Sequence, residues 1–146
     1  MNPTISYDEL NTQNHKITEL SNVLSVLIKD RTLCDSETCC TLFYNYMDRV
    51  NEHMQYVDST TYTGLLGDAS QEANNVANNF MAGSQEIKRI MKTYVRKWCN
   101  KKSKGLSIGA QHEQFLKETD EMFNMILDRA QDEMEHLYPM VRKISA

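Results

Sequence analysis

Four long stretches of the sequence place apolar residues at the 3.6-residue period of an amphipathic helix, and this pattern limits the fold more than any other feature. The stretches cover residues 15–28, 37–63, 70–100 and 110–141. No β-hairpin pattern separates them, and five glycines and two prolines in 146 residues are too few for a β-sandwich or barrel. The connections are short, so the sequence predicts an all-α fold, an up-down-up-down four-helix bundle.

Capping residues, glycines and a proline mark the expected ends of these helices. They are Asp35 or Ser36 before the second stretch, Gly64 and Gly67 after it, Asp68 or Ser70 before the third, and Pro139 near the end of the fourth, where it bends or weakens the last turn. The segment 101–109 has the composition of a loop. We therefore expect an N-terminal tail over residues 1–14 and a single bundle domain over residues 15–143.

The cysteines and the N-terminus bear on where the protein works. The N-terminus lacks a basic segment followed by an apolar one, and no run approaches the roughly 18 apolar residues of a membrane span. We therefore expect a cytoplasmic protein without a membrane partner, in which Cys34, Cys39, Cys40 and Cys99 are reduced, buried or neutral thiols. Two of them are adjacent, which is the wrong spacing for a C-x-x-C redox or zinc pair.

Basic residues are concentrated in one part of the chain. The formal net charge is −4, yet residues 87–111 contain eight basic residues and no acidic one, so the remainder carries −12. The eight are Lys88, Arg89, Lys92, Arg96, Lys97, Lys101, Lys102 and Lys104. This face could dock a protein partner, although the same cations could instead offset a helix dipole or neutralise the acidic fourth helix. No interleaved aromatic residues or glycine-rich motif accompany them, which argues against nucleic acid.

The second and fourth helices are related by an internal repeat. Residues 46–62 align with residues 122–138 at an offset of 76, and their apolar positions match. Each copy ends in a tyrosine, which lies nine residues after His53 in the first copy and nine residues after Arg129 in the second. We therefore expect these two helices to be equivalent elements of a two-fold bundle.

The second copy ends in Glu133-x-x-x-Leu137-Tyr138-Pro139. This ending resembles the fourth helix of the hemerythrin-like, cation-binding bundle family, whose pattern is His-x-x-x-Glu followed by Leu-aromatic-Pro. His53 is similarly placed to the histidine of that family's other His-x-x-x-Glu helix, and His15 resembles its first-helix histidine. The segment Phe80-x-x-Gly83-Ser84 adds a likeness to bacterial members, and the resemblance as a whole covers residues 15–142.

The resemblance implies two iron ions held by several histidines and bridging carboxylates, because each iron takes five or six nitrogen or oxygen donors. A His and a Glu four residues apart share one face of a helix, so both can reach the same ion. The residues that keep ligand positions are His15, His53 and Glu133. The positions that are substituted are Val57 for the carboxylate after His53, Arg129 for the histidine before Glu133, and Ser84 for the histidine of the third helix.

These substitutions favour a bundle without a cofactor. Arg129 precedes Glu133 by one helical turn, so its permanent positive charge could pair with that carboxylate where the family has its ion. Val57 beside the pair would fill the rest of the old cavity. Two alternatives stay open: one divalent ion held by the three remaining ligands, and an iron pair completed by ligands that the pattern does not reveal.

Two functional hypotheses follow. The first is a non-enzymatic regulatory or protein-interaction module that has kept the fold and lost its metal. The second, which the resemblance implies, is a protein that binds or senses iron, dioxygen, nitric oxide or a peroxide. An enzyme is not expected, because the sequence shows no Ser-His-Asp or Cys-His arrangement and no phosphate-binding glycine loop.

Overall fold

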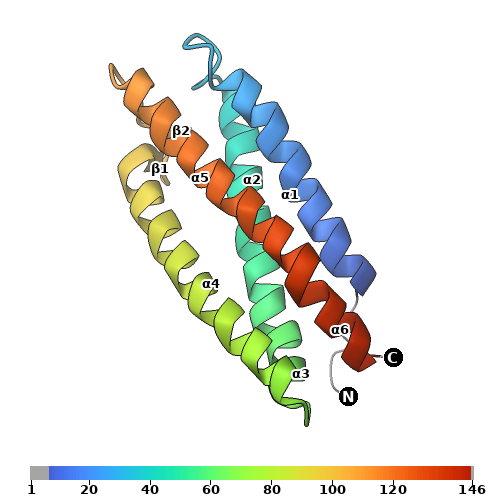
Figure 1. Ribbon diagram of the computed structural model, residues 1–146. Helices are drawn as coiled ribbons and strands as arrows, with labels where there is room; N and C mark the ends of the chain where they lie inside the picture. Colours follow the sequence, from blue (N-terminus) through green and yellow to red (C-terminus); the bar gives the residue numbers. More distant parts are fainter. Residues whose placement is uncertain (1–6, 146) are drawn as a thin grey trace.

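The computed structural model describes residues 7–145 and is an all-α bundle with one small strand pair. Its elements are α1 (Tyr7–Leu27), α2 (Glu37–Tyr56), the π-helical turn η1 (Val57–Thr61), α3 (Tyr62–Leu66), α4 (Gln71–Trp98), β1 (Cys99–Asn100), β2 (Gly105–Leu106), α5 (His112–Asp132), the π-helical turn η2 (Glu133–Leu137) and α6 (Tyr138–Ser145). Figure 1 shows four long helical rods side by side, because α2 runs through η1 into α3 and α5 runs through η2 into α6. The start of α1 and the end of α6 lie at the same end of the bundle.

The first helix is longer than the sequence predicts. α1 begins at Tyr7, so the expected tail is wrong for residues 7–14, while residues 1–6 lie outside the described part. The buried stripe of α1 is Leu10, Asn14, Ile17, Ser21 and Leu24. Asn14 and Ser21 are polar, so they interrupt the pattern of apolar residues. That pattern therefore does not predict the first two turns of α1.

Most helix ends follow their capping residues. The Ser36 hydroxyl accepts a hydrogen bond from the backbone N–H of Cys39 at 3.2 Å, and the Ser70 hydroxyl accepts one from Ala73 at 3.3 Å. Both predicted N-caps are therefore confirmed. α3 ends at Leu66 and is followed by Gly67, one of the two glycines expected there.

The segment after α4 is not wholly a loop. Cys99 pairs with Leu106 and Asn100 with Gly105 in a two-residue antiparallel ladder, although the sequence shows no hairpin pattern. The hydroxyl of Tyr44 donates to the carbonyls of Asn100 (3.1 Å) and Gly105 (3.0 Å), which fixes this hairpin against α2.

The internal repeat is visible in the backbone. An offset of 76 carries η1 (Val57–Thr61) onto η2 (Glu133–Leu137), and each π-helical turn is followed by a tyrosine. Only the second turn precedes a proline, Pro139, and the helix continues through that residue to Ser145. A π-helical turn therefore forms at η1 without a proline after it.

The π-helical turns decide where the two tyrosines point. Nine residues of ideal helix rotate a side chain by about 900°, which leaves it on the opposite face from its starting point. A π-helical turn accommodates one extra residue, so the rotation is nearer 800° and the end residue stays within about a quarter turn of the first. Tyr62 and Tyr138 are accordingly buried inside the bundle, where Tyr62 contacts Arg129 and Tyr138 contacts Glu133.

The apolar core is divided into two clusters. The larger contains Phe43, Tyr94, Trp98, Phe115 and Phe123, with Phe43 stacked on Tyr94 at a ring distance of 6.0 Å. The smaller contains Leu10, Val57, Leu65, Leu137 and Val141. Along each rod, buried polar residues stand between the two clusters, and they form the site described below.

No helix in residues 7–145 combines the length and the apolar character that crossing a membrane requires.

Candidate functional site

A layer of buried polar side chains crosses the bundle between its two apolar clusters. We call it the polar layer, and its members are Asn14 from α1, His53 from α2, Tyr62 from α3, Ser84 from α4, Arg129 from α5, Glu133 from η2 and Tyr138 from α6. Every rod therefore contributes at least one member, so the layer ties the whole bundle together.

Glu133 is the centre of the polar layer. Its Oε1 accepts hydrogen bonds from His53 Nε2 at 2.7 Å, from the Tyr138 hydroxyl at 3.0 Å and from Asn14 Nδ2 at 3.2 Å. Its Oε2 accepts from Arg129 Nε at 3.3 Å. Only 3% of Glu133 is exposed, so these four donors replace the water that a carboxylate would otherwise bind.

The surroundings of Glu133 favour its ionised form. Burial on its own raises the pKa of this carboxyl. The hydrogen bond and charge of His53, the charge of Arg129 and the hydrogen bond from Tyr138 act in the opposite sense and outweigh burial, so the pKa is lowered. Glu133 is therefore a buried carboxylate at neutral pH.

His53 uses both ring nitrogens. Nε2 faces the Glu133 carboxylate, and Nδ1 lies 2.6 Å from Oε1 of Gln13. The amide nitrogen of Gln13 donates to Glu9 at 2.9 Å, which leaves the amide oxygen of Gln13 to face the ring. Both nitrogens thus meet oxygen atoms of the protein, so the ring is held on two sides.

Arg129 lies inside the bundle, as the sequence predicts, with 14% of its side chain exposed. Beyond its pairing with Glu133, its Nη2 donates to the Tyr62 hydroxyl at 2.6 Å, to Ser84 Oγ at 2.9 Å and to the Phe80 carbonyl at 3.0 Å. The guanidinium carbon also lies 4.6 Å from the centre of the Phe80 ring. The expected ion pair is confirmed, within a larger set of contacts.

A glycine makes room for this guanidinium. A Cβ atom at position 83 would lie 2.8 Å from Nη1 of Arg129, closer than carbon and nitrogen can approach without movement. Gly83 stands in the interior of α4, where glycine normally weakens a helix. Its presence there is explained by the space that Arg129 occupies.

The polar layer has the approximate two-fold order of the repeat. Arg129 corresponds to His53, and Glu133 to Val57, which is buried in the smaller apolar cluster. The hydroxyl of Tyr138 accepts from Asn14 at 2.6 Å, while that of Tyr62 hydrogen-bonds with Ser84 at 3.0 Å. The two copies of the repeat differ at these positions, because the first copy has Val57 where the second has Glu133. Glu133 is therefore the one carboxylate among the members of the polar layer.

The structure corrects the expected role of His15. That side chain is 74% exposed and pairs with Glu19 on the outside of α1 at 3.1 Å. The buried position of this turn belongs to Asn14, one residue and about 100° away. Of the three predicted ligands, the structure therefore brings together only His53 and Glu133.

The side chains present do not fit a pair of iron ions. Within residues 7–145, no three His, Cys, Asp or Glu side chains lie close enough to share a metal ion. The cavity beside His53 and Glu133 has a volume of about 20 Å³, room for one water molecule, and Arg129 lines it. Two ligands are too few for two ions that each take five or six donors.

Sequence reasoning missed Gln13, Asn14, Gly83 and the two tyrosine hydroxyls as parts of the site. One usable signal was the polar Asn14 in the heptad-spaced stripe of α1. The other was the tyrosine at the same place in both copies of the repeat.

The four cysteines are free thiols, as expected. Cys34, Cys39 and Cys40 are buried, Cys99 is half-buried, and none forms a disulfide. Burial raises the pKa of all four thiols, that of Cys39 to about 11, so the nucleophilic thiolate is scarce at neutral pH.

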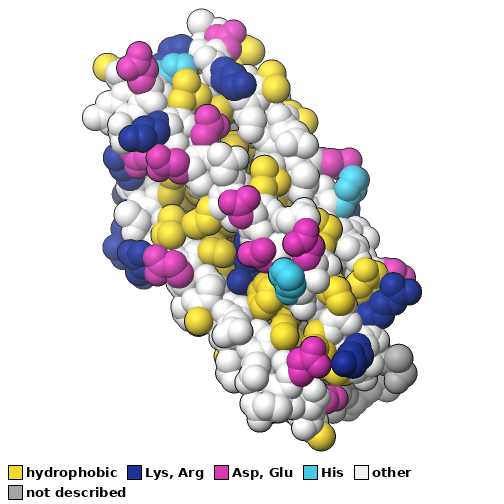
Figure 2. All heavy atoms as spheres, in the orientation of Figure 1, with side chains coloured by type: hydrophobic (Ala, Val, Ile, Leu, Met, Phe, Trp, Pro, Cys, Tyr) yellow, Lys and Arg dark blue, Asp and Glu magenta, His cyan; other side chains and the backbone are white. Residues whose placement is uncertain are grey.

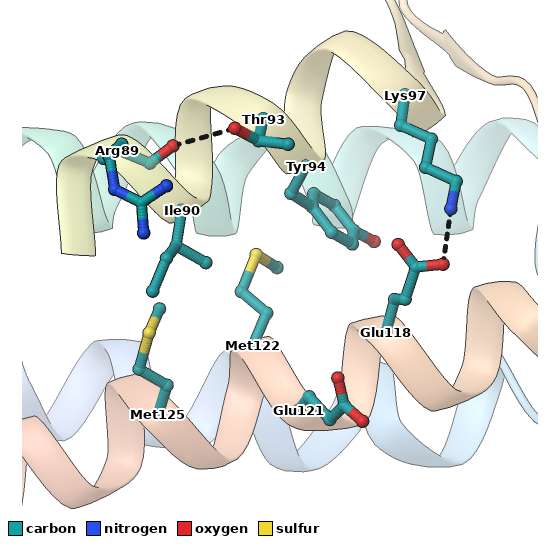
Figure 3. Close-up of a pocket in the computed structure, with 9 residues that line it drawn as sticks. All are labelled: Arg89, Ile90, Thr93, Tyr94, Lys97, Glu118, Glu121, Met122 and Met125. Carbon is teal, nitrogen blue, oxygen red and sulfur yellow. Dashed lines mark hydrogen bonds and ion pairs between the residues drawn. The ribbon is translucent and has the colours of Figure 1, made fainter. Parts of the chain in front are cut away.

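The basic face is only partly neutralised by α5. Lys97 on α4 pairs with Glu118 on α5 at 2.6 Å, above a groove of about 340 Å³ that Met122 and Met125 help to line (Figure 3). Lys88 pairs with Asp58 and Arg89 with Glu86, neither of which belongs to α5. In Figure 2, Lys and Arg side chains gather along the edge formed by α4, and Asp and Glu side chains lie over α5.

Comparisons with known proteins leave the family of this chain open. No protein-family model, curated protein or solved structure matches it.

Proposed function

We propose that this protein is a non-enzymatic regulatory or protein-interaction module, built on a metal-free, up-down-up-down bundle of hemerythrin-like type. In this proposal it acts in the cytoplasm, docks a protein partner, and uses the polar layer in place of a metal centre to hold its four rods in register.

The observation that carries the proposal is the position of the Arg129 guanidinium. It lies between Glu133 and the Tyr62–Ser84 pair, inside the bundle, where the resembling family would have a cation. Its permanent charge and planar set of donors suit a buried carboxylate. Because Arg129 already meets Glu133, binding of a cation by that carboxylate would bring two positive charges together.

A buried charged network also suits a scaffold rather than a reactive centre. Each polar group of the layer named above has a partner within the protein, so no group is left to bind a substrate. Such networks specify how helices align more than they add to stability. The surface is then free to carry the recognition of a partner.

Metal analysis of protein purified without oxygen tests the proposal. We expect far less than one iron per chain and no absorbance from an oxo-bridged pair. The double variant Val57→Glu, Arg129→His restores a His-x-x-x-Glu pair on each of the two repeat-related helices and should gain iron, whereas the matched variant Val57→Leu, Arg129→Lys should not. Stoichiometric iron in the unaltered protein, lost on His53→Ala, would overturn the proposal.

One observation favours the alternative, a protein that binds iron and senses dioxygen, nitric oxide or a peroxide. His53 Nε2 and Glu133 Oε1 are ligand atoms of the right kind and lie 2.7 Å apart on neighbouring rods. For an ion to bind there, Arg129 would have to leave Glu133. The alternative therefore predicts that Arg129→Met raises iron affinity, and our proposal predicts that it does not create a stoichiometric site.

A further inference from the structure

A groove between α2 and α4 carries most of the basic face identified from the sequence. Its volume is about 490 Å³, and it lies on a different side of α4 from the groove of Figure 3, which faces α5. Five basic residues line it: Lys88, Lys92, Arg96, Lys101 and Lys104. Asp48 on α2 is the one acidic residue in its lining. We call this feature the basic groove.

The cations of the basic groove form a line. Lys88, Lys92 and Arg96 are four residues apart on α4, so they share one helical face at steps of about 6 Å. Lys101 and Lys104 continue the basic lining into the β1–β2 connection. A ligand that meets all of them must be extended and carry several negative charges.

Three of these cations make no ion pair within the part of the chain that the structure describes. Lys88 pairs with Asp58, and Lys104 lies over the ring of Tyr44 at 5.5 Å. Among residues 7–145, Lys92, Arg96 and Lys101 make no ion pair. They are exposed and held close to one another, so an anion at this place would relieve their mutual repulsion.

The wall of the basic groove is apolar beneath these charges. Met47 and Met91 are buried beside it, and Val95 is half-buried between Lys92 and Arg96 in the sequence. Methionine adapts its shape to an incoming side chain, which suits a surface that receives apolar residues. The ligand should therefore have an apolar face beside its negative charges.

We propose that the basic groove binds an acidic, amphipathic helix of a partner protein. Carboxylates four residues apart on such a helix have the same spacing of about 6 Å as the cations of α4, and apolar residues beside them would reach Met91 and Val95. Nucleic acid fits less well, because Tyr44 is the one aromatic residue in the lining of the groove and one face of its ring already lies under Lys104. This inference rests on the proposed function, in which the chain docks a protein.

Fluorescence anisotropy with a designed peptide tests this proposal. The probe is a labelled helical peptide of about five turns, with glutamates at four-residue spacing beside a stripe of leucines. The triple variant Lys92→Glu, Arg96→Glu, Lys101→Glu should weaken binding at least about tenfold. The control variant Lys16→Glu, Lys29→Glu, Lys117→Glu changes the net charge equally at exposed cations outside the groove and should weaken binding less than about twofold.

Three outcomes would overturn the docking proposal. They are an absence of peptide binding, equal loss in both triple variants, and tighter binding of a single-stranded DNA of similar charge. A scrambled peptide that binds as well as the amphipathic one would also contradict it, because the apolar wall would then have no role. The iron content of the same preparation is measured in parallel: bound iron would overturn the proposed function without affecting the peptide result.

Discussion

Single residues of the polar layer act through charge and hydrogen bonding, and Arg129 makes four hydrogen bonds. Four acceptors depend on its guanidinium: Glu133 Oε2, the hydroxyls of Tyr62 and Ser84, and the Phe80 carbonyl. A neutral side chain of similar length would leave these acceptors without their donor in a region with little water. The effect should therefore exceed the worth of an ordinary surface ion pair.

Arg129→Met should lower the free energy of unfolding by about 3 kcal/mol, because it leaves Glu133 and three other acceptors short of a donor. Urea denaturation at neutral pH measures this. Arg89→Met is the matched control, since Arg89 is exposed and pairs with Glu86 within α4, and it should cost less than about 0.5 kcal/mol. If both variants lost the same free energy of unfolding, the buried contacts of Arg129 would be worth no more than the exposed ion pair of Arg89.

Glu133 should make stability depend on pH in the acid range. Its pKa in the folded protein lies below its usual 4.5, so its ionised form stabilises the fold at and above that pH. This stabilisation is lost as the pH falls below 4.5 and through the lower pKa of the folded state. Glu133→Gln should be less stable than the unaltered protein at neutral pH, and the gap should narrow on acidification.

Urea denaturation at about pH 7 and about pH 3 measures this gap. Glu52→Gln, at an exposed position of α2, serves as the control and should keep a constant, small difference from the unaltered protein. A Glu133→Gln gap that is the same at both pH values would contradict the account of the carboxylate.

Gly83 tests how the polar layer restricts the side chains that a neighbouring helix can carry. Gly83→Ala places a methyl group in an α-helix interior, which at an ordinary site would stabilise by about 1 kcal/mol. Here the new Cβ meets Arg129, so we expect a loss of stability instead. When Arg129 is also replaced by Met, Gly83→Ala should instead raise the free energy of unfolding, by most of that value of about 1 kcal/mol. A double-mutant cycle in urea measures the coupling, and additive effects would contradict it.

The π-helical turn η1 can be tested by a deletion. Removing the exposed Ser59 restores α-helical register and turns Tyr62 by about 100°, away from Arg129 and Ser84. We expect a loss of at least about 2 kcal/mol on thermal or urea unfolding. Ser59→Ala removes the same side chain but keeps the register, and should cost less than about 0.5 kcal/mol. Equal stability of the two variants would mean that the turn does not position Tyr62.

Much of the element level is predictable from local chemistry. Long apolar periodicity gives the helices, and the hydroxyls of Ser36 and Ser70 give two of their starts. Local chemistry does not predict the start of α1, because Asn14 and Ser21 are polar residues buried by tertiary contacts. The β1–β2 hairpin is missed for a similar reason, since Tyr44 from α2 helps to hold it.

At the scale of the whole molecule, the polar layer is where prediction from the sequence is only half right. The Arg129–Glu133 pair follows from spacing on one helix and is present. The resemblance to the bundle family places His15 at a ligand position, whereas burial in a bundle is decided by the register of the heptad-spaced stripe, which buries Asn14. The π-helical turns cannot be read from periodicity, although the repeat relates the two that occur.

We expect the interior of the bundle and its surface to have separate roles. In our proposal the layer aligns the rods, and the unpaired cations Lys92 and Arg96 on α4 and Lys101 after it recognise a partner. A change inside the layer should therefore alter stability more than peptide binding, and a change in the basic groove should do the reverse.

We infer that the Arg129 guanidinium, rather than a metal ion, occupies the middle of the bundle. Nitrogen-15 NMR of the arginine side chains tests it most directly, before and after anaerobic addition of ferrous iron. We expect the Arg129 Nε–H to exchange with solvent far more slowly than that of the exposed Arg96. We also expect ferrous iron to leave the NMR signals of Arg129 and His53 unchanged. Fast exchange at Arg129, with stoichiometric broadening of the His53 ring signals by iron, would contradict it.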